Sequence, residues 1–435
     1  MGDKMRKFVF TKTDNKFYVF PVGNHVGNSV FEVNKMGYEI LKAMENGKSD
    51  KEIVEDYVHR FPDIPTVRND ISNYCKSINN LVGKICENKG SINHAEVNMK
   101  VENITFEIQK YYIENNKPFK VFMELTYNCN LKCPHCYVQE DITRGAKFID
   151  KEKVFRLIDE FEEAGIVELN ITGGEASLHP DFVEIIRYAT SKNLLVNLLT
   201  NGQNIYKKHL VDELLDCPLK ELRISLYGNE EYHDNFVGVA GAFKRSTEVL
   251  KELRKKKGIG TGTYVITNEN KKYFDDLKKE LFKFNVPVIF SPVIMPTTHG
   301  DMKPTELRLS RMELKDVVEK HATTLHGATC TAGISRFRIT PEGIVNPCEM
   351  MRHIQLGNVY KTSFKEVMEG KKRTDWIEQF NNLIMRHSCN QCKLRPKCNM
   401  CPGLFYAEHK DFNRQSSFLC LYASVRQEVS QELEQ

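Results

Sequence analysis

The sequence predicts an α/β fold in which a partial (β/α)6 TIM barrel lies between a winged-helix-like N-terminal domain and a cysteine-rich C-terminal domain. Three observations predict it. Strand-like and helix-like patterns alternate through the middle of the chain, which favours parallel strands joined by right-handed crossovers. A short hairpin pattern followed by three helical patterns precedes them. Ten of the 13 cysteines fall into two spaced groups, one after the first strand of the alternating region and one near the C-terminus.

The N-terminal region is predicted to form three strands and then three helices, at residues 8–11, 17–21, 29–33, 35–44, 51–61 and 67–82. Ser49 and Glu52 have the spacing of a capping box at the start of the second helix. A hairpin with three helices is typical of winged-helix domains, which bind either DNA or a peptide. The third helix carries Arg68, Lys76 and Asp70 without forming a basic face. We therefore expect no binding of nucleic acid.

Six strands and five helices alternate in the central region. The strands are predicted at residues 121–126, 167–172, 195–200, 221–225, 262–266 and 288–291, and the helices at residues 150–164, 181–192, 207–216, 242–257 and 271–284. The active site of such a barrel lies at the carboxyl ends of its strands. Residues 86–117 are mixed and polar, and are predicted to be a linker containing one short helix or strand. The predicted domains are 1–85, 118–310 and 311–435.

Charge and hydropathy exclude several classes of protein. The 435-residue chain has 62 basic and 58 acidic residues and a net charge of +4, so charge gives no argument for a nucleic acid or an acidic membrane as partner. No apolar run of about 18 residues could span a membrane, and the N-terminus lacks the apolar core of a signal peptide. We expect a cytoplasmic protein, whose cysteines bind metal rather than form structural disulfides.

The first cysteine group, Cys129-x3-Cys133-x2-Cys136, follows a predicted strand directly. A loop that leaves a strand end can bring three thiols together on one face. Three thiolate ligands leave one iron of an iron–sulfur cluster free to bind another molecule, whereas a structural zinc site uses four ligands. His135 would complete a zinc set, and this alternative stays open at this point.

This spacing, followed by the aromatic residue Tyr137, resembles the signature of the radical S-adenosylmethionine (radical SAM) enzymes. The resemblance implies that the three cysteines hold a [4Fe–4S] cluster whose free iron binds S-adenosyl-L-methionine. It further implies reductive cleavage to a 5′-deoxyadenosyl radical, which abstracts a hydrogen atom from the substrate, while the protein supplies position and excludes water. Tyr137 is implied to pack near the adenine.

By the same resemblance the other cofactor contacts lie at the ends of the following strands, at Gly173, Gly174, Glu175, Thr200, Asn201 and Ser225. The two glycines allow the backbone to approach a ligand closely, and the glutamate supplies a charge for an ammonium group. Ala176 stands where the family usually has proline. Val237 stands where the family has arginine in its His-Asp-x-Phe-Arg-Gly run, so Lys244 or Arg245 is expected to contact the cofactor carboxylate instead.

The second cysteine group consists of Cys330, Cys348, Cys389, Cys392, Cys398, Cys401 and Cys420. Seven ligands do not fill two closed zinc sites. The pattern resembles the SPASM extension of radical SAM enzymes, which holds two auxiliary [4Fe–4S] clusters and would bring the total to three. The resemblance implies a first auxiliary cluster on Cys330, Cys348 and Cys401, and a second on the other four thiols. An open iron in the first could bind a substrate thiolate; a water or a non-cysteine ligand is the alternative.

The N-terminal domain resembles the PqqD-like peptide-recognition domains of enzymes that modify ribosomally made peptides. The resemblance implies that a leader peptide adds as a further strand beside the third predicted strand, with pockets on helix 66–82 supplying specificity. The implied leader-binding residues are Ser29, Val30, Phe31, Glu32 and Val33. A dimerisation or packing domain is the alternative.

Taken together, the chain resembles sactipeptide and ranthipeptide synthases, which install thioether crosslinks between a cysteine sulfur and a carbon. We expect a precursor peptide with a leader and a flavodoxin- or ferredoxin-type electron donor as partners. No residue is identified as a general acid or base, and the loop 295–301, with His299 and Asp301, is a candidate cover for the cavity. The alternatives are carbon–carbon crosslinking, formylglycine-type oxidation, and a zinc-dependent nucleic-acid-binding or scaffold protein.

Overall fold

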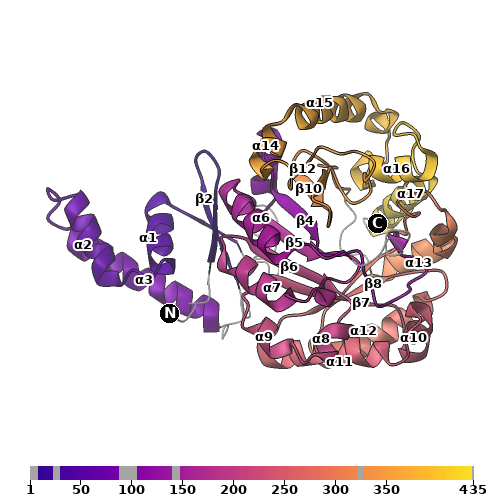
Figure 1. Cartoon of the computed structure of the whole chain (residues 1–435), viewed down its shortest axis with the longest axis horizontal. Helices are drawn as coiled ribbons and strands as arrows, with labels where there is room; N and C mark the ends of the chain where they lie inside the picture. The colour runs from indigo at the N-terminus through magenta and orange to yellow at the C-terminus, as the bar shows by residue number, and fades with distance from the viewer. Residues whose placement is uncertain (1–7, 23–29, 88–104, 140–146, 322–326, 434–435) are drawn as a thin grey trace.

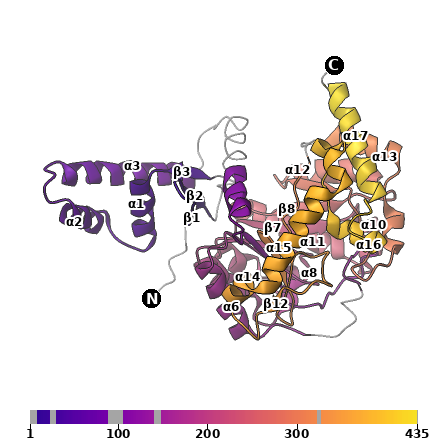
Figure 2. The same ribbon diagram turned by 90° about the horizontal axis from the view of Figure 1, so that it is seen from above.

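The computed structural model describes residues 8–22, 30–87, 105–139, 147–321 and 327–433. A nine-stranded sheet forms its centre, with helices along the outside, and a smaller three-stranded sheet with helices α1–α3 extends to one side (Figure 1, Figure 2). Within the described residues no helix is both long enough and apolar enough to cross a membrane.

Six parallel strands, paired in chain order, form the barrel part of the large sheet. They are β4 (Lys120–Glu124), β5 (Glu168–Thr172), β6 (Leu195–Thr200), β7 (Glu221–Leu226), β8 (Thr261–Val265) and β9 (Val288–Ser291). Alternate residues such as Val121, Met123 and Leu125 are completely buried against the outer helices, because successive side chains of a strand point to opposite faces. The predicted partial (β/α)6 barrel is confirmed.

The outer helices are α6 (Lys151–Glu163), α7 (Phe182–Ser191), α8 (Gln203–Lys207), α9 (Val211–Leu215), α10 (Glu230–Val237), α11 (Ala242–Lys257) and α12 (Phe274–Phe282). The prediction of one helix over 207–216 is wrong. His209 lies between α8 and α9 with a left-handed φ of 53°, which interrupts the helix. The sequence prediction also missed α10, which Asn229 caps by accepting a hydrogen bond from the Tyr232 backbone.

The C-terminal region extends the same sheet. It contains α13 (Arg311–His321), β10 (Arg336–Ile339), β11 (Ile344–Asn346), β12 (Gly357–Asn358), α14 (Phe364–Glu369), α15 (Lys371–Arg386), α16 (Pro402–His409) and α17 (Ser417–Leu433). Strand β10 pairs in parallel with β4, the first strand of the barrel. Cys330 and Cys348, which flank β10 and β11, are therefore held next to the first strand of the barrel. The sequence analysis did not predict this pairing.

The N-terminal elements are β1 (Phe8–Lys12), β2 (Phe17–Pro21), β3 (Phe31–Val33), α1 (Lys35–Glu45), α2 (Asp50–Arg60) and α3 (Val67–Glu87). Ser49 and Glu52 form the expected capping box at the start of α2. Asn193, next to β6, exchanges two hydrogen bonds of 2.8 Å with the backbone of Phe10. Residues 105–114 form a helix, whose Ile108 and Tyr112 pack against the small sheet.

Candidate active site

The loop that follows β4 brings the three thiols of the first cysteine group close to one another. The Cys136 N–H donates to the Cys133 carbonyl at 3.1 Å, and the Lys132 N–H donates to the carbonyl of Val237, at the end of α10, at 2.9 Å. Burial raises the pKa of Cys129 to about 11. It also raises the pKa of Cys133, and the neighbouring Cys136 and Cys129 raise it further. These thiols therefore form one partly buried group at the carboxyl end of the barrel.

His135 packs in an aromatic cluster, and among the described residues it does not join the thiols in a group that could hold one metal ion. Its ring stacks on Phe236 with the ring centroids 5.3 Å apart and meets the Tyr227 ring edge-on at 4.9 Å. Burial lowers its pKa to about 4, so the imidazole is neutral at physiological pH. Residues 233–238, which resemble the family's His-Asp-x-Phe-Arg-Gly run, therefore pack against the cysteine loop through Phe236 and Val237.

The carboxylate of Glu175 connects the ends of β5 and β6. It is almost completely buried and accepts hydrogen bonds from Ser177 N–H at 3.0 Å, Ser177 Oγ at 2.6 Å, Thr200 Oγ1 at 2.6 Å and Asn201 N–H at 2.6 Å. The Asn201 side chain in turn donates to Asn130, within the cysteine loop, at 2.7 Å. Three predicted cofactor residues thus belong to one hydrogen-bonded network. Their contacts with a cofactor stay predictions.

The two glycines let the end of β5 approach the cysteine loop. A Cβ atom on Gly173 would lie 2.4 Å from the backbone oxygen of Thr126, and one on Gly174 would lie 2.3 Å from that of Asn128. The Gly174 N–H donates to Thr126 at 2.8 Å, and the Glu175 N–H to Asn128 at 2.7 Å. Since no larger side chain fits, these glycines hold the loop against the strand end.

Lys244 and Arg245, the two residues expected to replace the family's arginine, have different surroundings. Lys244 is exposed and pairs with Glu248, one turn further along α11, at 4.0 Å. Arg245 donates to Gln203 Oε1 at 2.5 Å and to the Ala240 carbonyl at 2.8 Å. Of the two, Arg245 is the one held beside the strand ends.

Ser225, near the end of β7, hydrogen-bonds the hydroxyl of the buried Tyr227. Burial raises the pKa of Tyr227, and the hydrogen bond with Ser225 lowers it by a smaller amount. Tyr137 is partly buried, and desolvation of its side chain raises its pKa, which Glu349 of the C-terminal region raises further. The Thr298 N–H donates to the Tyr137 carbonyl at 2.8 Å. The loop proposed as a cover therefore contacts the end of the cysteine motif.

The seven C-terminal thiols separate into two groups in space. Burial raises the pKa of Cys330 to about 12, and Cys401 raises it further. Burial also raises the pKa of Cys348, and the nearby Cys330 and Cys401 both raise it further. Arg336, on β10, lies close enough to lower the pKa values of all three of these thiols.

The other group lies nearer the surface. Burial raises the pKa of Cys398 to about 11, with further contributions from Cys420, Cys389 and Cys392. Cys392 itself is exposed. The groups of three and four are the same sets that the resemblance implied, although sequence spacing alone does not separate Cys401 from Cys398.

The donor sets suit iron–sulfur clusters. In the described part of the chain, no three His, Cys, Asp or Glu side chains are grouped so that they could hold one metal ion. A zinc site requires such a group, because all its ligands bind the same ion. Thiolates around a [4Fe–4S] cluster bind different irons and stand further apart. The partly buried thiols, which are near one another but too far apart to share one ion, fit a cluster better than a zinc site.

A buried ion pair that the sequence analysis missed lies beside the site. Glu124, the last residue of β4, binds Arg338 of β10 and, at 2.7 Å, Arg352. Burial by itself raises the pKa of Glu124, but the two guanidinium groups outweigh it and hold the pKa below its ordinary value. Glu124 and Arg338 are 214 positions apart in the sequence. They meet only because β10 pairs with β4, so no local sequence signal predicts the contact.

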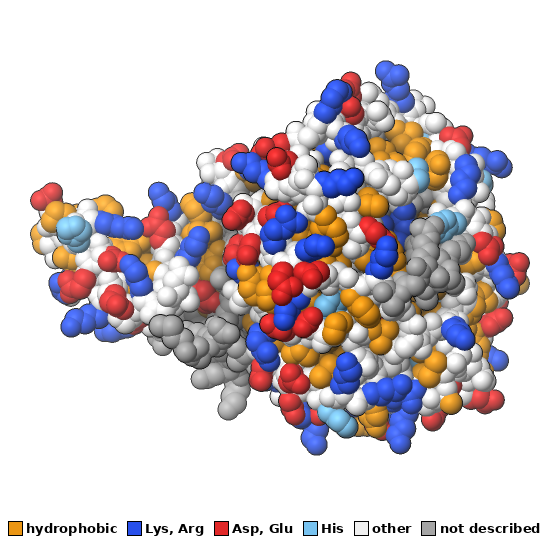
Figure 3. Space-filling view, viewed as in Figure 1, with side chains coloured by type: hydrophobic (Ala, Val, Ile, Leu, Met, Phe, Trp, Pro, Cys, Tyr) orange, Lys and Arg blue, Asp and Glu red, His pale blue; other side chains and the backbone are white. Residues whose placement is uncertain are grey.

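The N-terminal residues implied in leader binding are only partly described. Phe31, Glu32 and Val33 form β3, Val30 is buried just before it, and Ser29 lies outside the described residues. Within the described residues β3 pairs with β2 alone. A groove of about 610 Å³ lies between α1, α2 and α3, and hydrophobic side chains reach the surface among charged ones on this part of the molecule (Figure 3).

Comparison with known proteins agrees with this arrangement. Residues 123–281 match the model of the Radical SAM superfamily, and residues 330–402 match that of SPASM, an iron–sulfur cluster-binding domain. The AdoMet-dependent heme synthase of Methanosarcina barkeri is 26% identical, over 71% of this chain and 97% of its own. The antilisterial bacteriocin subtilosin biosynthesis protein AlbA of Bacillus subtilis is 26% identical, over 77% of this chain and 76% of its own.

Among solved structures, SuiB of Streptococcus suis bound to the precursor peptide SuiA has a similar fold. The TM-score is 0.56 at 15% sequence identity, and the match covers 94% of this chain and 98% of SuiB. At this identity the likeness concerns the fold alone.

Proposed function

Because the chain carries a radical SAM domain and a SPASM domain and is homologous to peptide-modifying radical SAM enzymes, we propose that it installs thioether crosslinks in a ribosomally made precursor peptide. The observation that carries this proposal is the division of the C-terminal thiols into a group of three, of which Cys348 is buried and the other two are partly buried, and a group of four. A three-thiolate group leaves one iron of a four-iron cluster without a protein thiolate, and iron in such clusters prefers soft sulfur ligands. A cysteine thiolate of the substrate is a suitable fourth ligand.

In this proposal Cys129, Cys133 and Cys136 hold the cluster that binds S-adenosyl-L-methionine, and the two C-terminal groups hold auxiliary clusters. When bound, these groups supply a 5′-deoxyadenosyl radical that removes hydrogen from a carbon of the peptide, and an acceptor for the surplus electron. The chain orients them through the Glu175 network and the close approach of Gly174 to the cysteine loop. Tyr137 and the aromatic cluster around His135 exclude water from the thiols.

The N-terminal domain would hold the leader, so that the remainder of the peptide reaches the barrel at a raised effective concentration. Two features support this. The free edge of β3 can accept a further strand, as peptides do in strand addition. The groove between α1, α2 and α3 is lined by apolar side chains, of which Phe61 and Ile64 are 45% and 48% exposed, together with the charged Lys35, Glu39, Arg60 and Asp70.

Leader binding is tested by Ile64→Asp, with Met312→Asp as the matched control because Met312 is 82% exposed on α13. The probe is a fluorescent synthetic peptide with the leader sequence of a candidate precursor, sought among short open reading frames next to the gene, and the readout is anisotropy. A charge in an apolar groove should weaken binding at least about tenfold, and the control should not. Equal binding by both variants would refute the assignment of the groove.

The reaction is tested by mass spectrometry of that precursor after co-expression with the enzyme. A thioether removes two hydrogens per crosslink and consumes one free thiol, which iodoacetamide then no longer alkylates. Carbon–carbon crosslinking also removes two hydrogens but leaves every thiol alkylatable, and formylglycine formation gives an aldehyde that reacts with hydrazides. Anaerobically reconstituted enzyme with a strong reductant must also produce 5′-deoxyadenosine, and failure to do so would overturn the whole proposal.

A further inference from the structure

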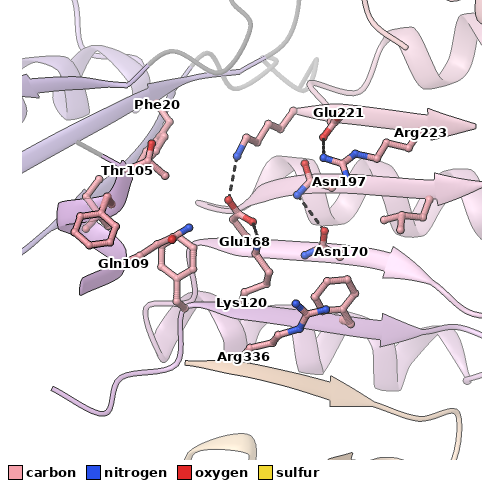
Figure 4. Close-up of a pocket in the computed structure, with 16 residues that line it drawn as sticks. Phe20, Thr105, Gln109, Lys120, Glu168, Asn170, Asn197, Glu221, Arg223 and Arg336 are labelled. Carbon is pink, nitrogen blue, oxygen red and sulfur yellow. Dashed lines mark hydrogen bonds and ion pairs between the residues drawn. The ribbon is translucent and has the colours of Figure 1, made fainter. Parts of the chain in front are cut away.

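A cavity of about 660 Å³ lies on the inner face of the barrel sheet, and Figure 4 shows the side chains that line it. The residues come from the lower and middle parts of β4 to β7, while Phe20 of β2 and Gln109 of the helix at 105–114 form the opposite wall. No cysteine lines it. The cavity therefore extends into the barrel from the side of the N-terminal domain, below the strand ends that carry the proposed cofactor site.

Two neutral amide side chains, Asn170 and Asn197, face each other in this cavity (Figure 4). They occupy paired positions on β5 and β6 and are 7% and 6% exposed. The Asn197 Nδ2 donates to Asn170 Oδ1 at 3.2 Å. This contact leaves Asn170 Nδ2 and Asn197 Oδ1 without a partner among the described residues.

The pair thus leaves one donor and one acceptor unpaired within the described part of the chain, at its two outer ends (Figure 4). The oxygen and nitrogen of an amide side chain are assigned from the hydrogen-bond network. If both amides are turned over, Asn170 keeps an unpaired acceptor and Asn197 an unpaired donor, so the pair still has one of each. Buried polar groups are costly to leave unpaired. A ligand that accepts from one amide and donates to the other is the complementary partner.

The charged side chains around the pair are largely matched to one another. Glu168 binds Lys120 at 2.6 Å and Lys220 at 3.0 Å, and Arg223 binds Glu221 at 2.7 Å. A carboxylate ligand would meet the acceptor oxygen of Asn197 and two carboxylates in the same cavity. An ammonium ligand would meet four cations, Lys120, Lys220, Arg223 and Arg336. Each of these cations already contacts a carboxylate, Arg336 through Glu349 at 2.5 Å, so the unpaired amide atoms, and not the charge of the cavity, favour a neutral group with its own donor and acceptor.

We propose that Asn170 and Asn197 bind an amide group of the substrate peptide inside the barrel, either a backbone peptide bond or the carboxamide of an asparagine or glutamine. The proposal rests on the peptide-modifying function. Asn170 lies two residues below the end of β5, about 7 Å along the strand. An amide held there places the atoms beside it toward the strand ends that carry the three thiols, so the pair would select and position the residue that reacts.

The test measures binding without turnover, so it does not depend on whether thioethers form. Saturation-transfer NMR on the full-length protein compares N-methylacetamide, a backbone mimic, and propionamide, a side-chain mimic, with N,N-dimethylacetamide, which has no N–H, and with acetate. The wild-type protein should bind at least one of the first two about threefold to tenfold more tightly than dimethylacetamide, the worth of one hydrogen bond. It should bind acetate no better than dimethylacetamide.

Asn170→Leu and Asn197→Leu each replace an amide with an apolar group of similar size and should abolish that preference. Asn381→Leu, at an exposed position on α15, is the matched control and should keep it. Thermal unfolding of each variant establishes that it is folded. A wild-type protein with no preference for amides with an N–H, a preference that survives in the Leu variants, or tighter binding of acetate would each overturn the proposal.

Discussion

The carboxylate of Glu124, at the end of β4, binds the guanidinium of Arg338 on β10, although 214 positions separate the two residues in the sequence. Both side chains are nearly inaccessible, with 4% and 1% exposed. Arg352 binds the second carboxylate oxygen. The pair joins the first strand of the barrel to the first strand of the C-terminal extension, between the two regions that hold the cysteine groups.

We expect Glu124→Leu to be strongly destabilising, because it leaves two buried guanidinium groups without their carboxylate. Removing one partner of a buried ion pair costs about 3–5 kcal/mol. Asp375→Ala is the control, since it breaks an exposed pair with Lys371 on α15 that is worth no more than about 1 kcal/mol. Thermal unfolding monitored by circular dichroism should show a large decrease in midpoint for the first variant and almost none for the second.

Acid should destabilise the barrel partly through Glu168. Burial alone raises the pKa of this carboxyl group, but Lys220 and Lys120 outweigh it and lower the pKa to about 2, from an ordinary value of 4.5. A folded-state pKa below the unfolded one adds stability above pH 4.5, and that stability is lost as pH falls toward 2.

Glu168→Gln should therefore be less stable than the wild type at pH 7, and the difference should shrink between pH 4.5 and pH 2. Urea unfolding at several pH values measures it. A difference that stays constant across this range would contradict the assigned pKa shift.

Gly174→Ala should weaken cofactor binding more than it disturbs the fold. Its Cβ would lie 2.3 Å from the backbone of Asn128, so the cysteine loop must move. Overpacking of this kind costs about 1–3 kcal/mol, and the same cost on the cofactor-bound state corresponds to about a 5-fold to 140-fold loss of S-adenosyl-L-methionine affinity.

Gly165→Ala is the control for that experiment. It has a positive φ of 72° but no atom within 4 Å of an added Cβ, so it introduces backbone strain alone. Anaerobic equilibrium dialysis should show unchanged affinity for this variant. Similar losses in both variants would mean that strain, and not contact with the loop, is responsible.

If the three thiol groups each hold the proposed cluster, Cys133→Ala should remove about one third of the bound iron and acid-labile sulfide and abolish 5′-deoxyadenosine production. Cys217→Ala is the matched control, because Cys217 is buried but donates to the Glu213 carbonyl at 3.4 Å, outside both cysteine groups. Iron and sulfide analysis after anaerobic reconstitution distinguishes the two. Full iron content in Cys133→Ala would show that this thiol is not a ligand.

The sequence predicted much of the barrel because its signals are local. The strands β4 to β9 carry apolar residues on the side that faces the outer helices, and a helical pattern separates each strand from the next, so both periods can be recognised without tertiary contacts. It failed where a single backbone angle matters, as at His209 between α8 and α9. It also missed α10, although Asn229 and the acidic residues after it are an N-terminal helix signal.

The amino-acid sequence alone determined the strand–helix alternation, the three-thiol motif and the residues at the strand ends, because hydrophobic period and ligand spacing are properties of neighbouring residues. Only the tertiary structure decided that β10 continues the barrel sheet, that Gly173 and Gly174 pack on the cysteine loop, and that Asn170 meets Asn197. These contacts join strands that are far apart in the chain. Their geometry follows from how the whole sheet assembles, which no local pattern encodes.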